Sequence, residues 1–136
     1  MKKLIPVLLV VIFFSCSKKS DPAPTPSMLL SQHTWVLAVL TSTDASIQTA
    51  SQILIGSEWS FKEDKSVLVS ISISGALTSV GGIWSLSSDG KTITMSNGVP
   101  GTTSVSEFEI VNLTSSSLKV TESHSGVVNT YTFNAK

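Results

Sequence analysis

Hydrophobic and polar residues alternate along most of the chain after residue 32, which is the period of a β-strand with one buried face. From Val67 to Ile73, valine and isoleucine occupy every second position, and serine or leucine stands between them. A helical period appears only weakly, at 45–54. The pattern predicts an all-β domain with strands at 33–41, 57–62, 66–74, 80–87, 91–96, 104–112, 117–123 and 127–134.

Turn-forming residues lie between these predicted strands. Asp89-Gly90 is a strong signal for a type I′ turn, and Gly75 and Ser125-Gly126 mark two further hairpins. Eight strands joined in this way predict an antiparallel up-and-down barrel. Closing the barrel removes exposed strand edges. This matters here because the strands are rich in serine and threonine and carry few of the charges that usually protect an edge.

The first residues have the pattern of an export signal. Lys2 and Lys3 precede eleven apolar residues, 4–14, which are too few for a bilayer span of about 20 residues. Ser15-Cys16 follows, and Cys16 is the only cysteine. This junction resembles the lipobox of bacterial lipoproteins, although Phe13 stands where an aliphatic residue is usual. The resemblance implies cleavage before Cys16 and lipid attachment there.

The expected organisation is therefore a signal peptide at 1–15, a lipidated Cys16 with a proline-rich tether at 16–27, and a barrel domain at 28–136. Alternating Pro22, Pro24 and Pro26 favour an extended tether. Ser17, rather than aspartate, follows the cysteine. By resemblance to the Gram-negative sorting rule, this implies an anchor in the outer membrane of the cell envelope. Whether the domain lies on the periplasmic or on the surface-exposed side of that membrane stays open.

Charge narrows the range of partners. Without residues 1–15, seven lysines stand against nine acidic residues, a net charge of −2, and the chain has no arginine. We expect no nucleic-acid binding, because a basic face is missing. A bidentate clamp for phosphate or carboxylate also lacks its usual residue. The expected partners are the membrane, through the lipid anchor, and a small apolar ligand. We expect the chain to be a monomer.

Motifs for catalysis are absent from the sequence. There is no Gly-x-Ser-x-Gly, Cys-x-x-Cys or His-Glu-x-x-His pattern and no phosphate-binding glycine loop. Glu107 and Glu109 alternate with Phe108 and Ile110, so we expect both carboxylates to face water. We therefore expect no catalytic residues, no metal site, no cofactor and no enzymatic activity.

A set of spaced residues resembles the small lipocalin-like domains of Gram-negative lipoproteins. The set begins with Leu29-Leu30 and Trp35 and continues through the patterns Trp59-x-Phe61-x-x-Asp64, Gly82-x-Trp84-x-Leu86-x-x-Asp89-Gly90-Lys91 and Phe108-x-Ile110-x-x-Leu113-x-x-x-x-Leu118. The resemblance covers about residues 28–136 and implies an eight-stranded barrel around an apolar interior. True lipocalins have a glycine where His33 stands, and an arginine that this chain lacks.

Two interpretations of the interior stay open. Eight strands enclose either a filled core or room for one small ligand. In the second case the chain is a membrane-anchored protein that binds a small apolar ligand. In the first it is a partner-binding or inhibitor-type envelope protein, with a protruding loop at 42–56 or 97–103. The residues that we expect to line the interior are Trp35, Trp59, Phe61, Ile71, Trp84, Phe108, Tyr131 and Phe133.

Overall fold

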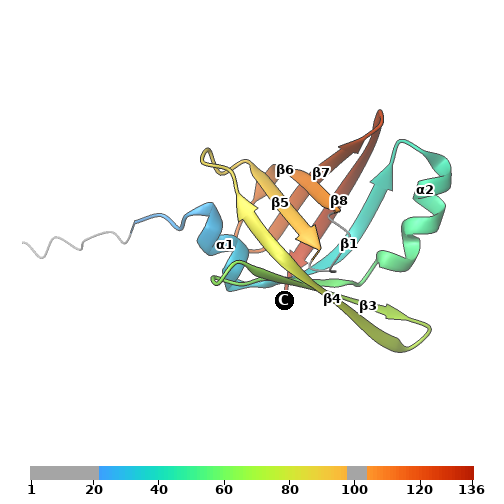
Figure 1. Cartoon of the computed structure of the whole chain (residues 1–136), viewed down its shortest axis with the longest axis horizontal. Helices are drawn as coiled ribbons and strands as arrows, with labels where there is room; N and C mark the ends of the chain where they lie inside the picture. The colour runs from blue at the N-terminus through green and yellow to red at the C-terminus, as the bar shows by residue number, and fades with distance from the viewer. Residues whose placement is uncertain (1–21, 98–103) are drawn as a thin grey trace, which may run out of the picture.

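The computed structural model describes residues 22–97 and 104–136, and in it eight antiparallel strands form a closed barrel in chain order (Figure 1). The predicted all-β up-and-down barrel is confirmed, and each predicted strand matches one observed strand. The strands are β1 (Thr34–Ser42), β2 (Glu58–Phe61), β3 (Ser66–Ile73), β4 (Ala76–Leu86), β5 (Thr92–Asn97), β6 (Val105–Leu113), β7 (Ser117–His124) and β8 (Val127–Ala135). The helices are α1 (Pro26–Gln32), α2 (Ala45–Ala50) and the 3₁₀ helix η1 (Ser51–Leu54).

The first helix begins inside the segment predicted to be a tether. Thr25 caps α1, its hydroxyl accepting a hydrogen bond from the Met28 amide, and Pro26 takes the first helical position. Proline is favoured there because its missing N–H needs no partner. Residues 25–27 therefore belong to the folded part, whereas the predicted signal peptide and Cys16 lie outside the described residues. No helix among the described residues has the length and apolar character needed to cross a membrane.

The two ends of the barrel differ, and we call them the closed end and the open end. The closed end carries α1 and the connections at 62–65, 87–91 and 114–116. Leu30 of α1 is fully buried, and Trp35 Nε1 donates to its carbonyl oxygen over 3.0 Å. The open end carries α2, η1 and the turns at 74–75 and 125–126 (Figure 1).

Most of the residues expected in the interior are there. Six of the eight are buried: Trp35, Phe61, Trp84, Phe108, Tyr131 and Phe133. Trp59 is half-buried and packs against this core. Ile71 is also half-buried but stands outside the core, so its expected interior position is wrong.

The reason is that the β3–β4 hairpin is longer than its neighbours. β3 pairs with β4 from Ser66 to Ile73, whereas β2 reaches only Ser70 and β5 reaches only Gly82. Residues 71–81 therefore form a two-stranded segment, here called the ribbon, that extends beyond the barrel wall (Figure 1). Ile71 and Ile73 keep the alternation of a buried strand but lie on this ribbon.

The turns also differ from prediction in one case. Ser74 and Gly75 both have positive φ, as do Ser125 and Gly126, which is the requirement of a type I′ turn. At Asp89-Gly90, where the sequence predicts such a turn, only Gly90 has positive φ. The Gly90 amide donates to the Ser87 carbonyl instead, so the connection is longer than two residues.

Candidate functional site

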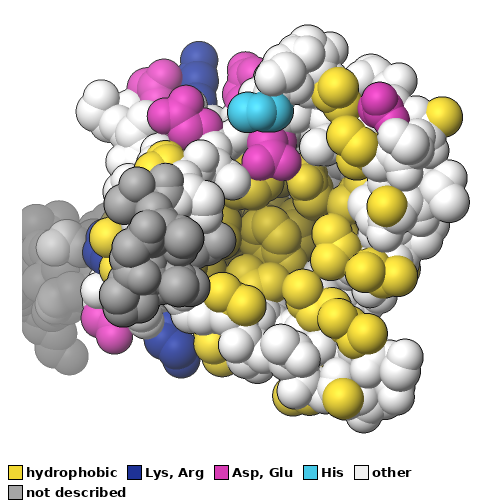
Figure 2. Space-filling view, turned by 45° about the vertical axis from the view of Figure 1, so that its right-hand side comes forward, with side chains coloured by type: hydrophobic (Ala, Val, Ile, Leu, Met, Phe, Trp, Pro, Cys, Tyr) yellow, Lys and Arg dark blue, Asp and Glu magenta, His cyan; other side chains and the backbone are white. Residues whose placement is uncertain are grey.

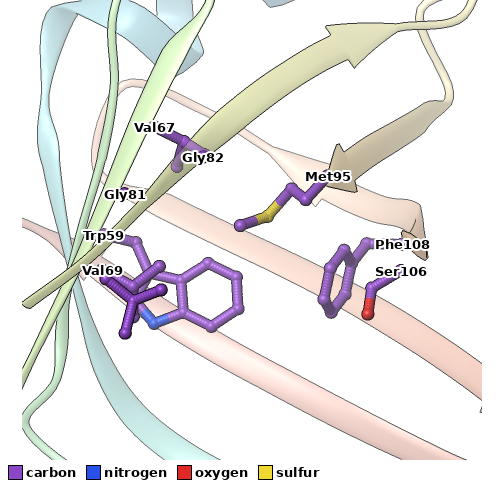
Figure 3. Close-up of a pocket in the computed structure, with 9 residues that line it drawn as sticks. Trp59, Val67, Val69, Gly81, Gly82, Met95, Ser106 and Phe108 are labelled. Carbon is purple, nitrogen blue, oxygen red and sulfur yellow. The ribbon is translucent and has the colours of Figure 1, made fainter. Parts of the chain in front are cut away.

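A cavity of about 220 Å³ lies inside the wall formed by β2 to β6. Hydrophobic side chains line the hollow that Figure 2 shows, and Figure 3 shows the residues around the cavity. Two lining residues, Phe108 and Ser106, lie on β6. Ser106 is next to the start of this strand, so the lining reaches toward the open end. The described lining residues are Trp59, Val67, Val69, Val80, Gly81, Gly82, Met95, Ser106 and Phe108.

Room is left here because small residues occupy the inward positions. Gly82, which has no side chain, pairs with Val67, and Ser106 pairs with Met95. Nearer the closed end, bulky rings fill the interior of the barrel. Phe61 and Trp84 pack edge to face there, with their ring centroids 5.4 Å apart. The barrel is therefore filled in its closed half and hollow beside β3 to β6.

Trp59 separates the filled half from the cavity. Its Nε1 donates to the hydroxyl of buried Ser57 over 3.1 Å, which satisfies the indole N–H. Its ring lies 5.1 Å from that of Phe133 and 5.6 Å from that of Phe108, centroid to centroid. These contacts fix the indole, which presents an apolar face to the cavity (Figure 3).

Three polar side chains, here called the polar group, lie on the inner wall formed by β7 and β8, opposite the cavity: Glu122, Asn129 and Tyr131. The Tyr131 hydroxyl donates to Glu122 Oε2 over 2.8 Å. Burial, and secondarily the Glu122 carboxylate, raises the pKa of the Tyr131 phenol, while a hydrogen bond from Asn129 opposes this rise. Asn129 Oδ1 is buried and has no hydrogen-bond partner.

The eight residues predicted to line the interior separate into four groups. Trp59 and Phe108 line the cavity. Trp35, Phe61, Trp84 and Phe133 belong to the packed core, and Tyr131 belongs to the polar group. Ile71 lies on the ribbon.

Sequence reasoning missed Glu122, and it missed seven of the lining residues: Val67, Val69, Val80, Gly81, Gly82, Met95 and Ser106. The alternation carried a signal for Glu122, because this residue continues the inward phase of Leu118 and Val120. Glu107 and Glu109 are exposed, as expected.

Positive charge is kept away from the cavity. Among the described residues, no lysine lines it. Lys62, Lys65 and Lys91 stand in or beside closed-end connections, and Lys65 Nζ lies 4.2 Å from the centroid of the Trp84 ring. Lys136 pairs with Glu58 over 2.6 Å. The described residues contain no group of three or more histidine, cysteine or acidic side chains that could hold a metal ion.

The closed eight-stranded meander with one end covered by a helix is a lipocalin-like fold. A lipocalin-like protein from Bacteroides uniformis is similar to 78% of this chain over 97% of its own, with 19% identity and a TM-score of 0.53. Bovine odorant-binding protein in complex with undecanal matches 79% of the chain over 73% of its own, at 21% identity and a TM-score of 0.52. The same bovine protein with a selenium-containing odorant covers 88% of the chain and 78% of its own, with 18% identity and a TM-score of 0.53. No family model and no curated protein sequence matches the chain.

Proposed function

We propose that this chain is a lipid-anchored envelope protein whose barrel binds a small apolar ligand in the cavity beside Trp59. The observation that carries the proposal is the cavity itself, about 220 Å³ in volume and lined mainly by apolar side chains. A buried apolar cavity of about 150 Å³ accepts benzene, whereas drug-sized ligands need about 300 Å³ or more. The volume therefore suits a ligand somewhat larger than benzene.

The chemistry of the lining narrows the ligand class. A buried anion needs a paired cation or several converging donors, and no described lining residue is a lysine. The bovine odorant-binding protein, which shares the fold, was solved with undecanal, an uncharged aldehyde. Both observations support a neutral or apolar ligand over an anionic one.

The anchor is supported by the sequence and by where the fold begins. Cys16 follows directly after the apolar segment, as in a lipobox. Thr25 and Pro26 lie at the closed end, because a side chain added at Gly90 of the closed-end connection would contact Pro26. The segment that carries Cys16 is thus joined at the closed end, opposite the turns at 74–75 and 125–126.

A calorimetric titration of the full chain with 2-phenylethanol tests the ligand proposal. Ser106→Leu fills the cavity, and we expect it to weaken binding by about tenfold or more, since a leucine displaces ligand volume. Ser85→Leu, on the exposed outer face of β4, is the matched control and should keep the wild-type affinity. The absence of saturable binding to the wild-type chain would contradict a cavity that accepts uncharged apolar molecules of this size.

One observation favours a second candidate function, which is partner binding by the ribbon. Its two edges have no partner strand among the described residues, and the sequence holds no charged residue from Ser66 to Ser88. Such an edge can receive a strand from another protein. If so, a photo-cross-linker at Leu77, which is 73% exposed, should capture one envelope protein in cells, and Ser72→Pro should abolish the capture.

A further inference from the structure

The inner wall opposite the cavity carries more hydrogen-bond acceptors than donors. Glu122 and Asn129 lie on β7 and β8, paired with each other, and both are half-buried. The Tyr131 hydroxyl donates to Glu122 Oε2 over 2.8 Å, and Asn129 Oδ1 is buried without a partner. A buried acceptor with no partner is unfavourable. A donor arriving from outside the chain would remove this imbalance.

This acceptor group adjoins the cavity. The Tyr131 ring lies 5.6 Å from the Phe108 ring and 6.0 Å from the Trp59 ring, and both of those residues line the cavity. Glu109 of β6 pairs with Thr121 of β7. Because side chains alternate between the two faces of a strand, the next residues toward the open end, Phe108 and Glu122, are neighbours on the inner face. Figure 2 shows acidic side chains and a histidine beside the apolar hollow. One molecule could therefore contact the apolar lining and the acceptors together.

We propose that the ligand is a small apolar amine, whose hydrocarbon part fills the cavity and whose protonated amino group donates to the Glu122 carboxylate and to Asn129 Oδ1. This rests on the proposed ligand-binding function and names the class of molecule that the same site prefers. An ammonium group offers three donors and no acceptor, which matches the surplus. Hydrogen bonds between an ammonium and a carboxylate are also stronger than those between neutral groups. A carboxylate ligand would instead approach Glu122 with like charge.

Three ligands of closely similar size test this preference: phenethylamine, 2-phenylethanol and phenylacetate, each titrated calorimetrically into the full chain at neutral pH. We expect the amine to bind about tenfold more tightly than the alcohol, and phenylacetate to bind most weakly. Glu122→Gln should reduce the ratio of amine to alcohol affinity to about threefold or less, since the charge is removed. Glu109→Gln, on the exposed outer face of β6, is the matched control and should keep the full ratio.

Two failures can be told apart. Saturable binding of 2-phenylethanol without a preference for the amine, or a preference that survives Glu122→Gln, overturns the assignment of the head group and leaves the cavity as a ligand site. No saturable binding of any of the three ligands overturns the proposed function itself. The ranking in the unchanged chain is decisive even if Glu122→Gln does not fold.

Discussion

Tyr131 is the residue at which the apolar interior meets the polar wall. Its ring packs against Trp59 and Phe108, while its hydroxyl donates to Glu122 over 2.8 Å. Burial and the nearby carboxylate both favour the neutral phenol, so its pKa in the folded chain lies above the ordinary value of 10.0. One side chain thus links core packing to the charge that we assign to ligand selection.

This raised pKa predicts a pH dependence of stability. Above about pH 10 the phenol ionises in the unfolded chain but stays neutral in the folded one, so stability present below pH 10 is lost as the pH rises. Tyr131→Phe should be less stable by about 1 kcal/mol at pH 8, where it lacks the hydrogen bond. Denaturant unfolding at pH 8 and pH 11 measures both chains. The stability difference should shrink at the higher pH, and an unchanged difference would contradict a raised pKa.

At the scale of secondary-structure elements, the β3–β4 hairpin gives the barrel its asymmetry. The part of the hairpin nearer the closed end forms barrel wall, and Val67 in it is 3% exposed. The ribbon extends beyond the wall, and Leu77 in it is 73% exposed. The change occurs where β2 and β5 stop pairing with it, and the cavity lies at the same place, lined by Val69 and Val80. The hairpin therefore supplies both a wall of the site and an exposed ribbon.

Two lysine substitutions distinguish these parts of the hairpin. Val67→Lys buries an unpaired ammonium in the core and should prevent folding. Ile71→Lys, two positions along the same face, can extend its side chain into water and should cost about 1 kcal/mol or less. Chemical unfolding monitored by circular dichroism measures both. Equal loss of stability would mean that residue 71 lies within the barrel after all.

The alternation of apolar residues was enough to predict all eight strands and their order, because each strand buries only one face. It could not predict where neighbouring strands end, so Val67 and Ile71 carry the same signal but lie in different surroundings. It also could not locate the cavity, which depends on small residues such as Gly82 and Ser106 rather than on the aromatic rings. Glu122 was missed because attention to apolar positions passes over a polar residue in the same phase.

At the scale of the whole molecule, the first described residues and the proposed ligand site lie toward different ends of the barrel. The described chain enters at the closed end through Thr25 and Pro26, beside the connection that holds Gly90. Ser106, next to the start of β6, brings the cavity lining toward the open end.

Substitution of Cys16 tests the anchor. Metabolic labelling with an alkyne fatty acid should mark the wild-type chain and not Cys16→Ala, and the variant should leave the membrane fraction or stay unprocessed. Stable attachment requires acyl chains, each buried CH₂ contributing about 0.8 kcal/mol. Ser17→Ala, one residue away, is the control and should label as the wild type does. A wild-type chain without label would remove the anchor from this account but leave the barrel unaffected.

The central claim is that the cavity beside Trp59 holds a small apolar ligand, and a ligand with an anomalous scatterer tests it most directly. Crystals of the chain grown with 2-(4-bromophenyl)ethanol should show one strong bromine peak inside the barrel, within about 4.5 Å of Met95 or Phe108. Ser106→Leu crystals under the same conditions should show none there. A wild-type barrel without bromine at saturating ligand, or bromine bound only on the outer surface, would contradict the account.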